Sequence, residues 1–212
     1  MKAVLISIQP KWVEKIASGE KTIEVRKSRP KLEVPFKVYI YCTKEKRKDD
    51  FITISGAFGL IRCPECAIYN RAKEYDCNGR VIGEFVCDRI DKYKYRLTTY
   101  EETPCKGKYI SKEELAKTCL SIGEINDYLN GKNGYFWHIS DLKIYDKPKE
   151  LSEFYLQCEE YGKTGTVDIP KKCKKCRYQY TWNLASKCRI DGLKPITKPP
   201  QSWCYVKELQ NG

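Results

Sequence analysis

The stretch SIQPKWVEKIASGEKTIEVRK, residues 7–27, decides the first part of the fold. Pro10 stands where a helix can begin and Gly19 where it can end. Between them, one apolar face recurs at helical spacing and consists of Trp12, Val13, Ile16 and Ala17. Upstream, alternating apolar residues over 4–8 predict a strand with one buried face. The expected order is strand, short helix and turn.

After the turn, residues 21–27 return to the period of two that is typical of a strand. Ile23 and Val25 are expected to enter the core. The opposite face then presents three polar residues to a shared surface: Thr22, Glu24 and Arg26. In a regular strand, Lys21 would point away from Glu24. The pattern therefore predicts a polar surface beside the turn.

Further elements follow from the same patterns. Strands are predicted over 36–42, 51–61, 80–90 and 135–146, and helices over 111–117 and 122–129. Ser111 followed by Glu113 and Glu114 is an N-terminal helix signature. Many short strands with few helices favour an α+β fold, a small β-barrel with short helices at its rim.

The charge balance narrows the choice of partner. Lys and Arg number 40 and Asp and Glu number 28, giving a formal net charge of +12 over 212 residues. Such a surplus attracts polyanions, of which nucleic acid is the commonest, with an acidic protein or membrane surface as alternatives. No apolar run is long enough to cross a bilayer and no secretory signal is visible. We therefore expect a soluble, cytoplasmic protein that does not enter a membrane.

Composition changes after Pro148, which predicts a main domain over 1–148 and a C-terminal extension over 149–212. The extension is poor in Leu, Ile and Val, so it needs packing on the main domain or a staple. Its thiols supply a candidate zinc site at Cys173, Cys176, Cys188 and Cys204, with Cys158 as an alternative to Cys204. An iron–sulfur cluster and buried free thiols are the other interpretations.

A second and weaker set of candidate metal ligands lies earlier in the chain. It consists of Cys63, Cys66, Cys77 and Cys87, and Cys42 is a further candidate. Cys87 falls within a predicted strand, where burial as a small hydrophobic residue is the ordinary outcome.

Two basic stretches carry interleaved tyrosines, at residues 91–96 and 171–180. Basic side chains contact phosphates and aromatic faces stack on bases, which predicts a platform for single strands. The stronger candidate contributes Lys171, Lys172, Lys174, Lys175 and Arg177. The basic run at 44–50 is expected to be a solvated loop.

Two stretches, SIQPKWVEKIASGEKTIEVRK at 7–27 and YFWHISDLKIYDKP at 135–148, resemble the ASCH domain family, a branch of the PUA-like fold. The first carries that family's G-x-K-x-x-E-x-R signature as Gly19, Lys21, Glu24 and Arg26. The segment PPQSWCYV at 199–206 resembles uncharacterised ASCH proteins of phage and mobile elements.

The resemblance implies a β-barrel with a cleft beside the motif that binds RNA or a modified nucleobase. The residues expected to contact nucleic acid are Lys21, Glu24, Arg26 and Arg29, together with the basic cluster of the extension. Some ASCH proteins look like enzymes, an N4-acetylcytidine amidohydrolase and a ribonuclease. The alternative is therefore a hydrolase using Lys21, Thr22 and Glu24, although Glu24 stands where the amidohydrolase pattern has threonine.

His138 is the only histidine and follows the apolar residues Phe136 and Trp137. Such a residue is usually found in the core or at its rim with one hydrogen bond. An acid–base role together with Glu24 is the functional alternative.

Overall fold

The structure is a computed structural model that describes residues 2–44, 77–94, 110–158 and 192–209, with the backbone of 53–54, 60–61 and 75–76. In chain order its elements are β1 (Lys2–Ile8), α1 (Pro10–Ala17), β2 (Ile23–Arg26), β3 (Phe36–Cys42), β4 (Thr53–Ile54), β5 (Leu60–Ile61), β6 (Tyr75–Asp76), β7 (Val81–Tyr93), α2 (Lys112–Thr118), α3 (Ile122–Leu129), β8 (Gly134–Lys149), the 3-10 helix η1 (Leu151–Glu153), β9 (Tyr155–Gln157), β10 (Leu193–Pro195) and β11 (Trp203–Lys207).

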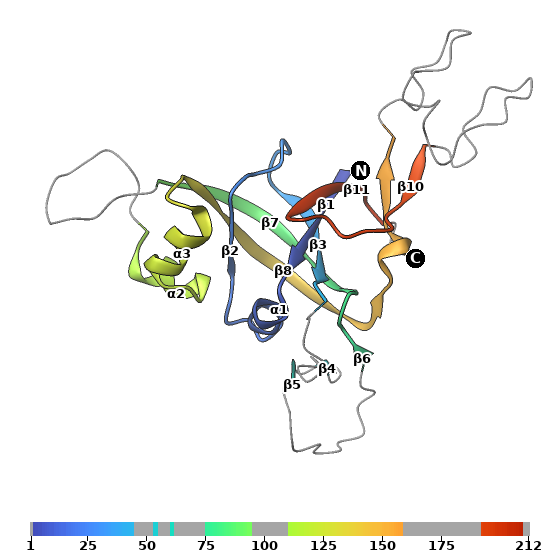
Figure 1. The fold of residues 1–212 in the computed structure, drawn as a ribbon, viewed down its shortest axis with the longest axis horizontal. Coiled ribbons are helices and arrows are strands. Elements are labelled where there is room, and N and C mark those ends of the chain that lie inside the picture. Colours follow the sequence, from blue (N-terminus) through green and yellow to red (C-terminus); the bar gives the residue numbers. More distant parts are fainter. Residues whose placement is uncertain are drawn as a thin grey trace, which may run out of the picture.

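Six strands form the main sheet, in the order β11-β1-β3-β7-β8-β2 (Figure 1). β1 and β3 run parallel, and the other neighbours are antiparallel. The α+β class agrees with the sequence, but the described strands do not close into a barrel, because β11 and β2 form the two edges of the sheet. Side-chain contacts from Arg26 bridge the gap between β2 and β1 instead.

The C-terminal strand changes the environment of the N-terminal one. β11 pairs with β1 in antiparallel register, so that Leu5 lies opposite Cys204 and Ile6 opposite Trp203. β1 is consequently buried on both faces, and Leu5 and Ile6 are both fully buried. The prediction of a single buried face was wrong, because the C-terminal residues Phe154, Ile196 and Val206 cover the face that carries Leu5.

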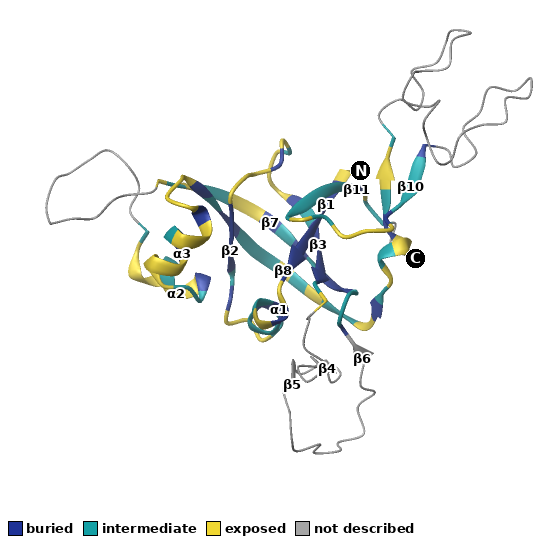
Figure 2. Ribbon diagram, in the orientation of Figure 1, coloured by how far each residue is buried: buried dark blue, intermediate teal, exposed yellow. Residues whose placement is uncertain are grey.

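The predicted helices are present. α2 and α3 begin with capping boxes in which Ser111 and Ser121 accept hydrogen bonds from the backbone of Glu114 and Glu124. Each cap contributes about 1 kcal/mol to helix stability. Both helices pack on the outer face of β2 and β8 through an apolar cluster whose buried members are Ile23, Val25, Ile125, Leu129 and Phe136 (Figures 1 and 2).

The strand predicted over 51–61 is instead two short strands, β4 and β5, which pair antiparallel. β7 and β8 are longer than predicted and form the longest ladder of the sheet. β8 ends at Lys149 and so runs through the predicted boundary at 148. In the described part of the chain, no helix is long and apolar enough to cross a membrane.

Candidate functional site

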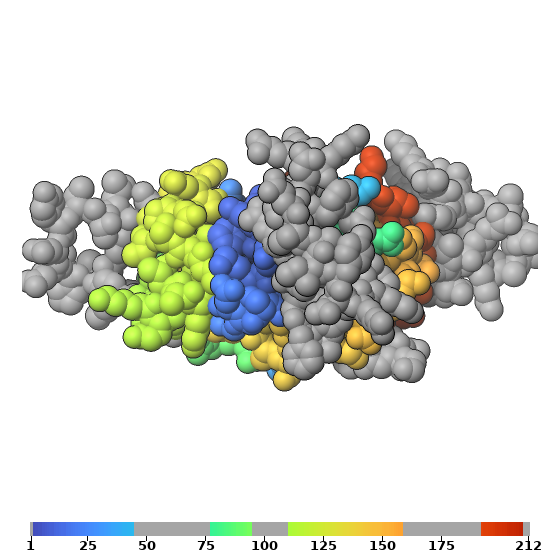
Figure 3. All heavy atoms as spheres, turned by 90° about the horizontal axis from the view of Figure 1, so that it is seen from below, coloured from blue at the N-terminus to red at the C-terminus, as the bar shows by residue number. Residues whose placement is uncertain are grey.

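A cleft of about 680 Å³ opens at the end of β1, beside β2. Its walls come from segments far apart in sequence: Ser7, Ile8, Gln9, Lys11, Trp12, Lys21, Glu24, Val25, Arg26, Thr43, Leu120, Glu124, Asp127, Tyr128, Pro199, Pro200 and Gln201. Seen from below, the yellow-green surface of α2 and α3 lies directly beside the blue surface of the N-terminal segment (Figure 3). The cleft therefore combines the N-terminal motif, helix α3 and the C-terminal segment.

The motif glycine makes the turn that brings the site together. Gly19 has a φ of 80°, in the left-handed region that favours glycine, and a Cβ there would meet no atom within 4 Å. The requirement for glycine is thus conformational and not spatial. Immediately afterwards, the Lys21 amide donates to the Lys15 carbonyl at 2.8 Å, which turns the chain from α1 toward β2.

Lys21 is buried, and its side chain is only 2% exposed. Its Nζ donates to the carbonyls of Ile23 at 3.0 Å and Thr118 at 2.7 Å. It also lies 3.3 Å from Glu24 Oε2. The prediction that Lys21 points away from Glu24 was wrong, because β2 begins only at Ile23 and strand alternation does not govern the residues before it. An ammonium has three donors, and three acceptors surround this one.

Glu24 and Arg26 lie on one face of β2, as predicted, and form an ion pair. Glu24 Oε1 lies 3.0 Å from Arg26 Nη2, and the two side chains are 9% and 6% exposed. Glu24 is therefore shared between two cations, one at each oxygen. We call Lys21, Glu24 and Arg26 the cleft triad; its formal charge is +1, and all three members line the cleft. The triad is thus a buried group of charges in the wall of the cleft.

Arg26 also ties three parts of the chain together. Its Nη2 donates to the Ser7 carbonyl at 2.7 Å, and its Nη1 donates to Ser202 Oγ at 3.4 Å. Its Nε is buried and has no acceptor within the described part of the chain. A buried donor without a partner is costly, since it has lost its water without gaining a protein acceptor. The guanidinium is thus held through Nη1 and Nη2, while Nε stays unsatisfied among the described residues.

Two aromatic residues, Trp12 and Tyr128, line the cleft. Neither was assigned to a site from the sequence. Trp12 has Lys11 Nζ at 4.4 Å and Lys21 Nζ at 5.4 Å from its ring centroid. Tyr128 has Lys27 Nζ at 5.2 Å from its ring centroid. Burial raises the pKa of the Tyr128 hydroxyl and the Glu24 charge adds to the rise, while the neighbouring Arg26 opposes it. In the sequence, both residues read only as parts of amphipathic helices.

Two further predicted site residues, Thr22 and Arg29, lie in the described part of the chain. Among the described residues, Thr22 and Arg29 do not line the cleft. Arg29 is exposed in the segment after β2. The basic cluster of the extension, at Lys171, Lys172, Lys174, Lys175 and Arg177, lies outside the described residues.

A second polar group occupies the opposite face of the β2–β8 pair. His138 lies opposite Ile23 in the register, whereas Trp137 lies opposite Glu24. Because side chains alternate along a strand, His138 and Glu24 project from different faces of the sheet. The proposed acid–base pairing of His138 with Glu24 was therefore wrong.

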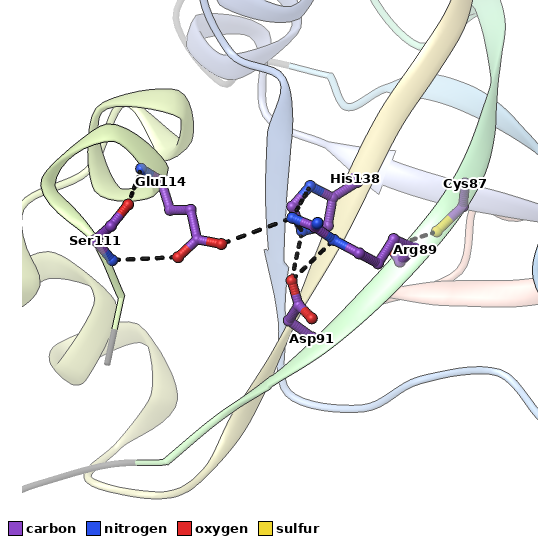
Figure 4. Close-up of polar contacts among 6 residues, drawn as sticks. All are labelled: Cys87, Arg89, Asp91, Ser111, Glu114 and His138. Carbon is purple, nitrogen blue, oxygen red and sulfur yellow. Dashed lines mark hydrogen bonds and ion pairs between the residues drawn. The ribbon is translucent and has the colours of Figure 1, made fainter. Parts of the chain in front are cut away.

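The side-chain partners of His138 come from β7, and one of them, Arg89, also contacts α2 (Figure 4). His138 Nε2 lies 2.9 Å from Asp91 Oδ2, and Arg89 Nη2 lies 3.0 and 3.2 Å from the two ring nitrogens. The Arg89 guanidinium therefore lies beside both ring nitrogens of His138. Arg89 also lies near Glu114 Oε1, at 3.6 Å, and its side chain is 53% exposed. We call these four residues the helix-face cluster.

Of the predicted metal ligands, Cys63, Cys66, Cys173, Cys176 and Cys188 lie outside the described residues. Cys42, Cys77 and Cys87 are buried in the main core. Burial raises the pKa of the Cys87 thiol to about 12 and that of the Cys204 thiol to about 11. Within the described ranges, no group of three or more His, Cys, Asp or Glu residues could hold a metal ion.

The sheet, the few helices and the motif-lined cleft define an α+β domain of the PUA-like class. Residues 6–186 match the model of the ASCH domain family, and the chain belongs to that family. Among solved structures, it is similar to ASCH from Zymomonas mobilis at 15% identity, covering 97% of this chain and 88% of that chain with a TM-score of 0.46. A variant of the same protein gives 15% identity, coverages of 97% and 89%, and a TM-score of 0.48. No curated protein matches the sequence.

Proposed function

We propose that the protein binds nucleic acid and that the cleft receives a base of RNA or a modified base. The observation that carries the proposal is a single cleft lined by both the cleft triad and two aromatic rings, those of Trp12 and Tyr128. Membership in the ASCH family supports the same class of partner, since ASCH domains are in general nucleic-acid-binding.

The charges along the cleft suit a nucleobase. One side carries the net positive cleft triad, and the α3 side carries Glu124 and Asp127. A base edge presents acceptors and donors next to each other, so its acceptors can face Arg26 while its amino groups face the acidic side. The net charge of +12 adds the general attraction to phosphate that nucleic-acid binding requires.

Trp12 and Tyr128 supply the aromatic surfaces. Lysines accompany both rings, Lys11 at Trp12 and Lys27 at Tyr128. Stacking of a base on an aromatic side chain contributes about 1–3 kcal/mol and tolerates any base. Exposed lysines next to such rings can contact the flanking phosphates at the same time. The same cleft can therefore hold the base and the adjoining backbone.

The experiment is a fluorescence-anisotropy titration of a short single-stranded RNA and a duplex DNA, at low and near-physiological salt. The proposal predicts preferential RNA binding that weakens as salt rises, and a Trp12→Leu variant that stays folded but binds RNA at least about tenfold more weakly. A wild-type protein that binds neither nucleic acid at low salt would overturn the proposal.

A hydrolase is the second candidate, because Lys21 and Glu24 are in contact inside the cleft. That reaction would use Lys21, Thr22 and Glu24. The geometry favours binding over catalysis, since three acceptors already occupy the Lys21 ammonium and Thr22 is not among the described lining residues. Turnover of N4-acetylcytidine or RNA by the wild-type protein, lost in Lys21→Ala, would establish the hydrolase; no turnover with intact RNA binding would exclude it for these substrates.

We further propose that the extension binds zinc through Cys173, Cys176 and Cys188, with Cys204 or Cys158 as the fourth ligand, and adds its basic cluster to the nucleic-acid surface. The sequence spacing supports this. The position of Cys204 in β11, with a raised thiol pKa, favours Cys158. Elemental analysis of the purified full chain tests the site: about one zinc per chain, lost in Cys173→Ser, is expected, and absence of zinc from the wild-type protein would contradict it.

A further inference from the structure

A C-terminal segment forms one side of the cleft. The segment Pro199–Ser202, here called the strap, contributes Pro199, Pro200 and Gln201 to the lining. The family match ends at residue 186, so the strap lies beyond the matched part of the chain. The cleft of this protein is therefore completed by residues that the family match does not include.

Ser7, in β1, holds the strap in place through two hydrogen bonds. Ser7 Oγ donates to the Pro200 carbonyl at 2.6 Å, and the Ser7 amide donates to the Ser202 carbonyl at 2.9 Å. β11 begins at the next residue and pairs along β1. Trp203 Nε1 adds a hydrogen bond to Ser28 Oγ at 3.1 Å. Two consecutive prolines restrict the backbone further, so the strap has a defined position beside the cleft.

The strap also reaches the cleft triad. Ser202 Oγ accepts from Arg26 Nη1, and Ser7, which holds the strap, accepts from Arg26 Nη2 through its carbonyl. These contacts hold the guanidinium in place beside the strap. The strap thus adjoins the group that we expect to bind the ligand.

Gln201 is the polar side chain of the strap at the cleft, and it is exposed. Its amide offers a donor and an acceptor side by side, which matches the paired groups on a base edge. Pro199 and Pro200 present apolar ring surfaces beside it. A fixed segment with one amide at the rim can distinguish bases without contributing charge.

We propose that the strap is a specificity-determining wall of the cleft and that Gln201 contacts the bound base or its neighbour in single-stranded RNA. The inference rests on the proposed function of the same cleft. Its ligand class is a nucleobase with donor and acceptor groups on one edge, and the contact sets preference between bases more than overall affinity.

The experiment compares the affinities of short oligo-A, oligo-C and oligo-U RNAs, each end-labelled, for three full-length proteins: wild type, Gln201→Ala and Lys198→Ala. Lys198 is exposed just before the strap and does not line the cleft among the described residues. We expect unequal wild-type affinities, a change of about threefold or more in their ratios in Gln201→Ala, and an equal change for all three RNAs in Lys198→Ala.

The two proposals fail in different ways. Wild-type binding to none of the RNAs would overturn the nucleic-acid function, and the strap inference with it. Equal wild-type affinities for all three RNAs, or ratios that are the same in wild type and Gln201→Ala, would overturn the strap inference and leave RNA binding standing. Circular dichroism of Gln201→Ala checks that the exposed substitution preserves the fold.

Discussion

The two faces of the β2–β8 pair carry polar groups that differ in burial: the cleft triad is more buried than the helix-face cluster. The cleft triad has side chains that are 2%, 9% and 6% exposed for Lys21, Glu24 and Arg26. The helix-face cluster ranges from 14% for His138 to 53% for Arg89. Both groups combine acids and bases at similar distances. Burial therefore decides what each interaction contributes.

Burial has this effect because it removes the alternative partner, water. Removing one member of a buried ion pair leaves a charge without solvent and costs about 3–5 kcal/mol. An exposed pair regains hydration when it is broken, so its net contribution is about 0–1 kcal/mol. The comparison predicts large stability effects on the cleft face and small ones on the helix face.

The largest effect is expected for Glu24→Gln. This change keeps the size of the side chain but leaves two buried cations, Lys21 and Arg26, without their shared carboxylate. The free energy of unfolding should fall by about 3–5 kcal/mol in urea denaturation. A loss below about 1 kcal/mol would show that water reaches the triad in solution.

A smaller loss is expected for Lys21→Met. The substitution leaves the carbonyls of Ile23 and Thr118 without their side-chain donor, while Glu24 keeps its contact with Arg26. Unsatisfied buried acceptors predict a loss of about 2–3 kcal/mol in urea denaturation. Lys15→Met is the matched control, because Lys15 pairs with Glu20 on the surface and should show no measurable change. Equal effects of the two substitutions would contradict the burial argument.

The buried thiol of Cys87, beneath the helix-face cluster, leads us to expect that the free energy of unfolding depends on pH. Cys87 Sγ donates to the Arg89 carbonyl at 3.5 Å, and burial raises its pKa to about 12 from an ordinary value near 9. Between these values the unfolded chain releases the proton and the folded chain retains it, so stability falls as pH rises above 9. The stabilisation is fully present below pH 9. Over one pH unit the loss is on the order of 1 kcal/mol.

Urea denaturation at pH 8 and pH 10 measures this loss. Lysines and tyrosines titrate in the same range, so the comparison is made with Cys87→Ala. That variant should lose less stability between the two pH values than the wild type does. Identical pH dependence in both proteins would mean that the thiol ionises in the folded protein.

The smallest effect is expected for Glu114→Gln, which matches Glu24→Gln in chemistry. Its carboxylate lies 3.6 Å from an exposed guanidinium and also caps α2 at the Ser111 amide. Gln preserves the capping acceptor and removes only the charge, so the unfolding free energy should fall by about 0–1 kcal/mol. A loss as large as that of Glu24→Gln would remove the distinction between the two faces.

Local patterns predicted much of the fold. α1, α3 and β3 follow from apolar spacing and caps within a few residues, and the structure places them at the predicted positions. The motif also identified Glu24 and Arg26 as members of one face. These features depend on neighbours in sequence, and periodicity reports such neighbours directly.

The missed features depend on distant segments. The pairing of β11 with β1 joins the two ends of the described chain, and no local pattern linked the proline-bearing C-terminal segment to the cleft. Tyr128 and the strap line the cleft only because the fold brings segments that are far apart in sequence together. The position of Lys21 was missed because a long side chain before a strand can fold back onto it. The sequence alone also could not show that Arg26 is buried.

The most direct test compares Arg26→Gln with Arg89→Gln in binding to the same single-stranded RNA. Charge reversal at Arg26 is unsuitable, because it would place a second carboxylate beside buried Glu24; Gln retains a donor, and circular dichroism checks folding. We predict that Arg26→Gln weakens binding about tenfold or more, equivalent to about 1.4 kcal/mol, and that Arg89→Gln changes it less than about twofold. Equal losses, or unchanged affinity in folded Arg26→Gln, would contradict the assignment of the cleft as the nucleic-acid site.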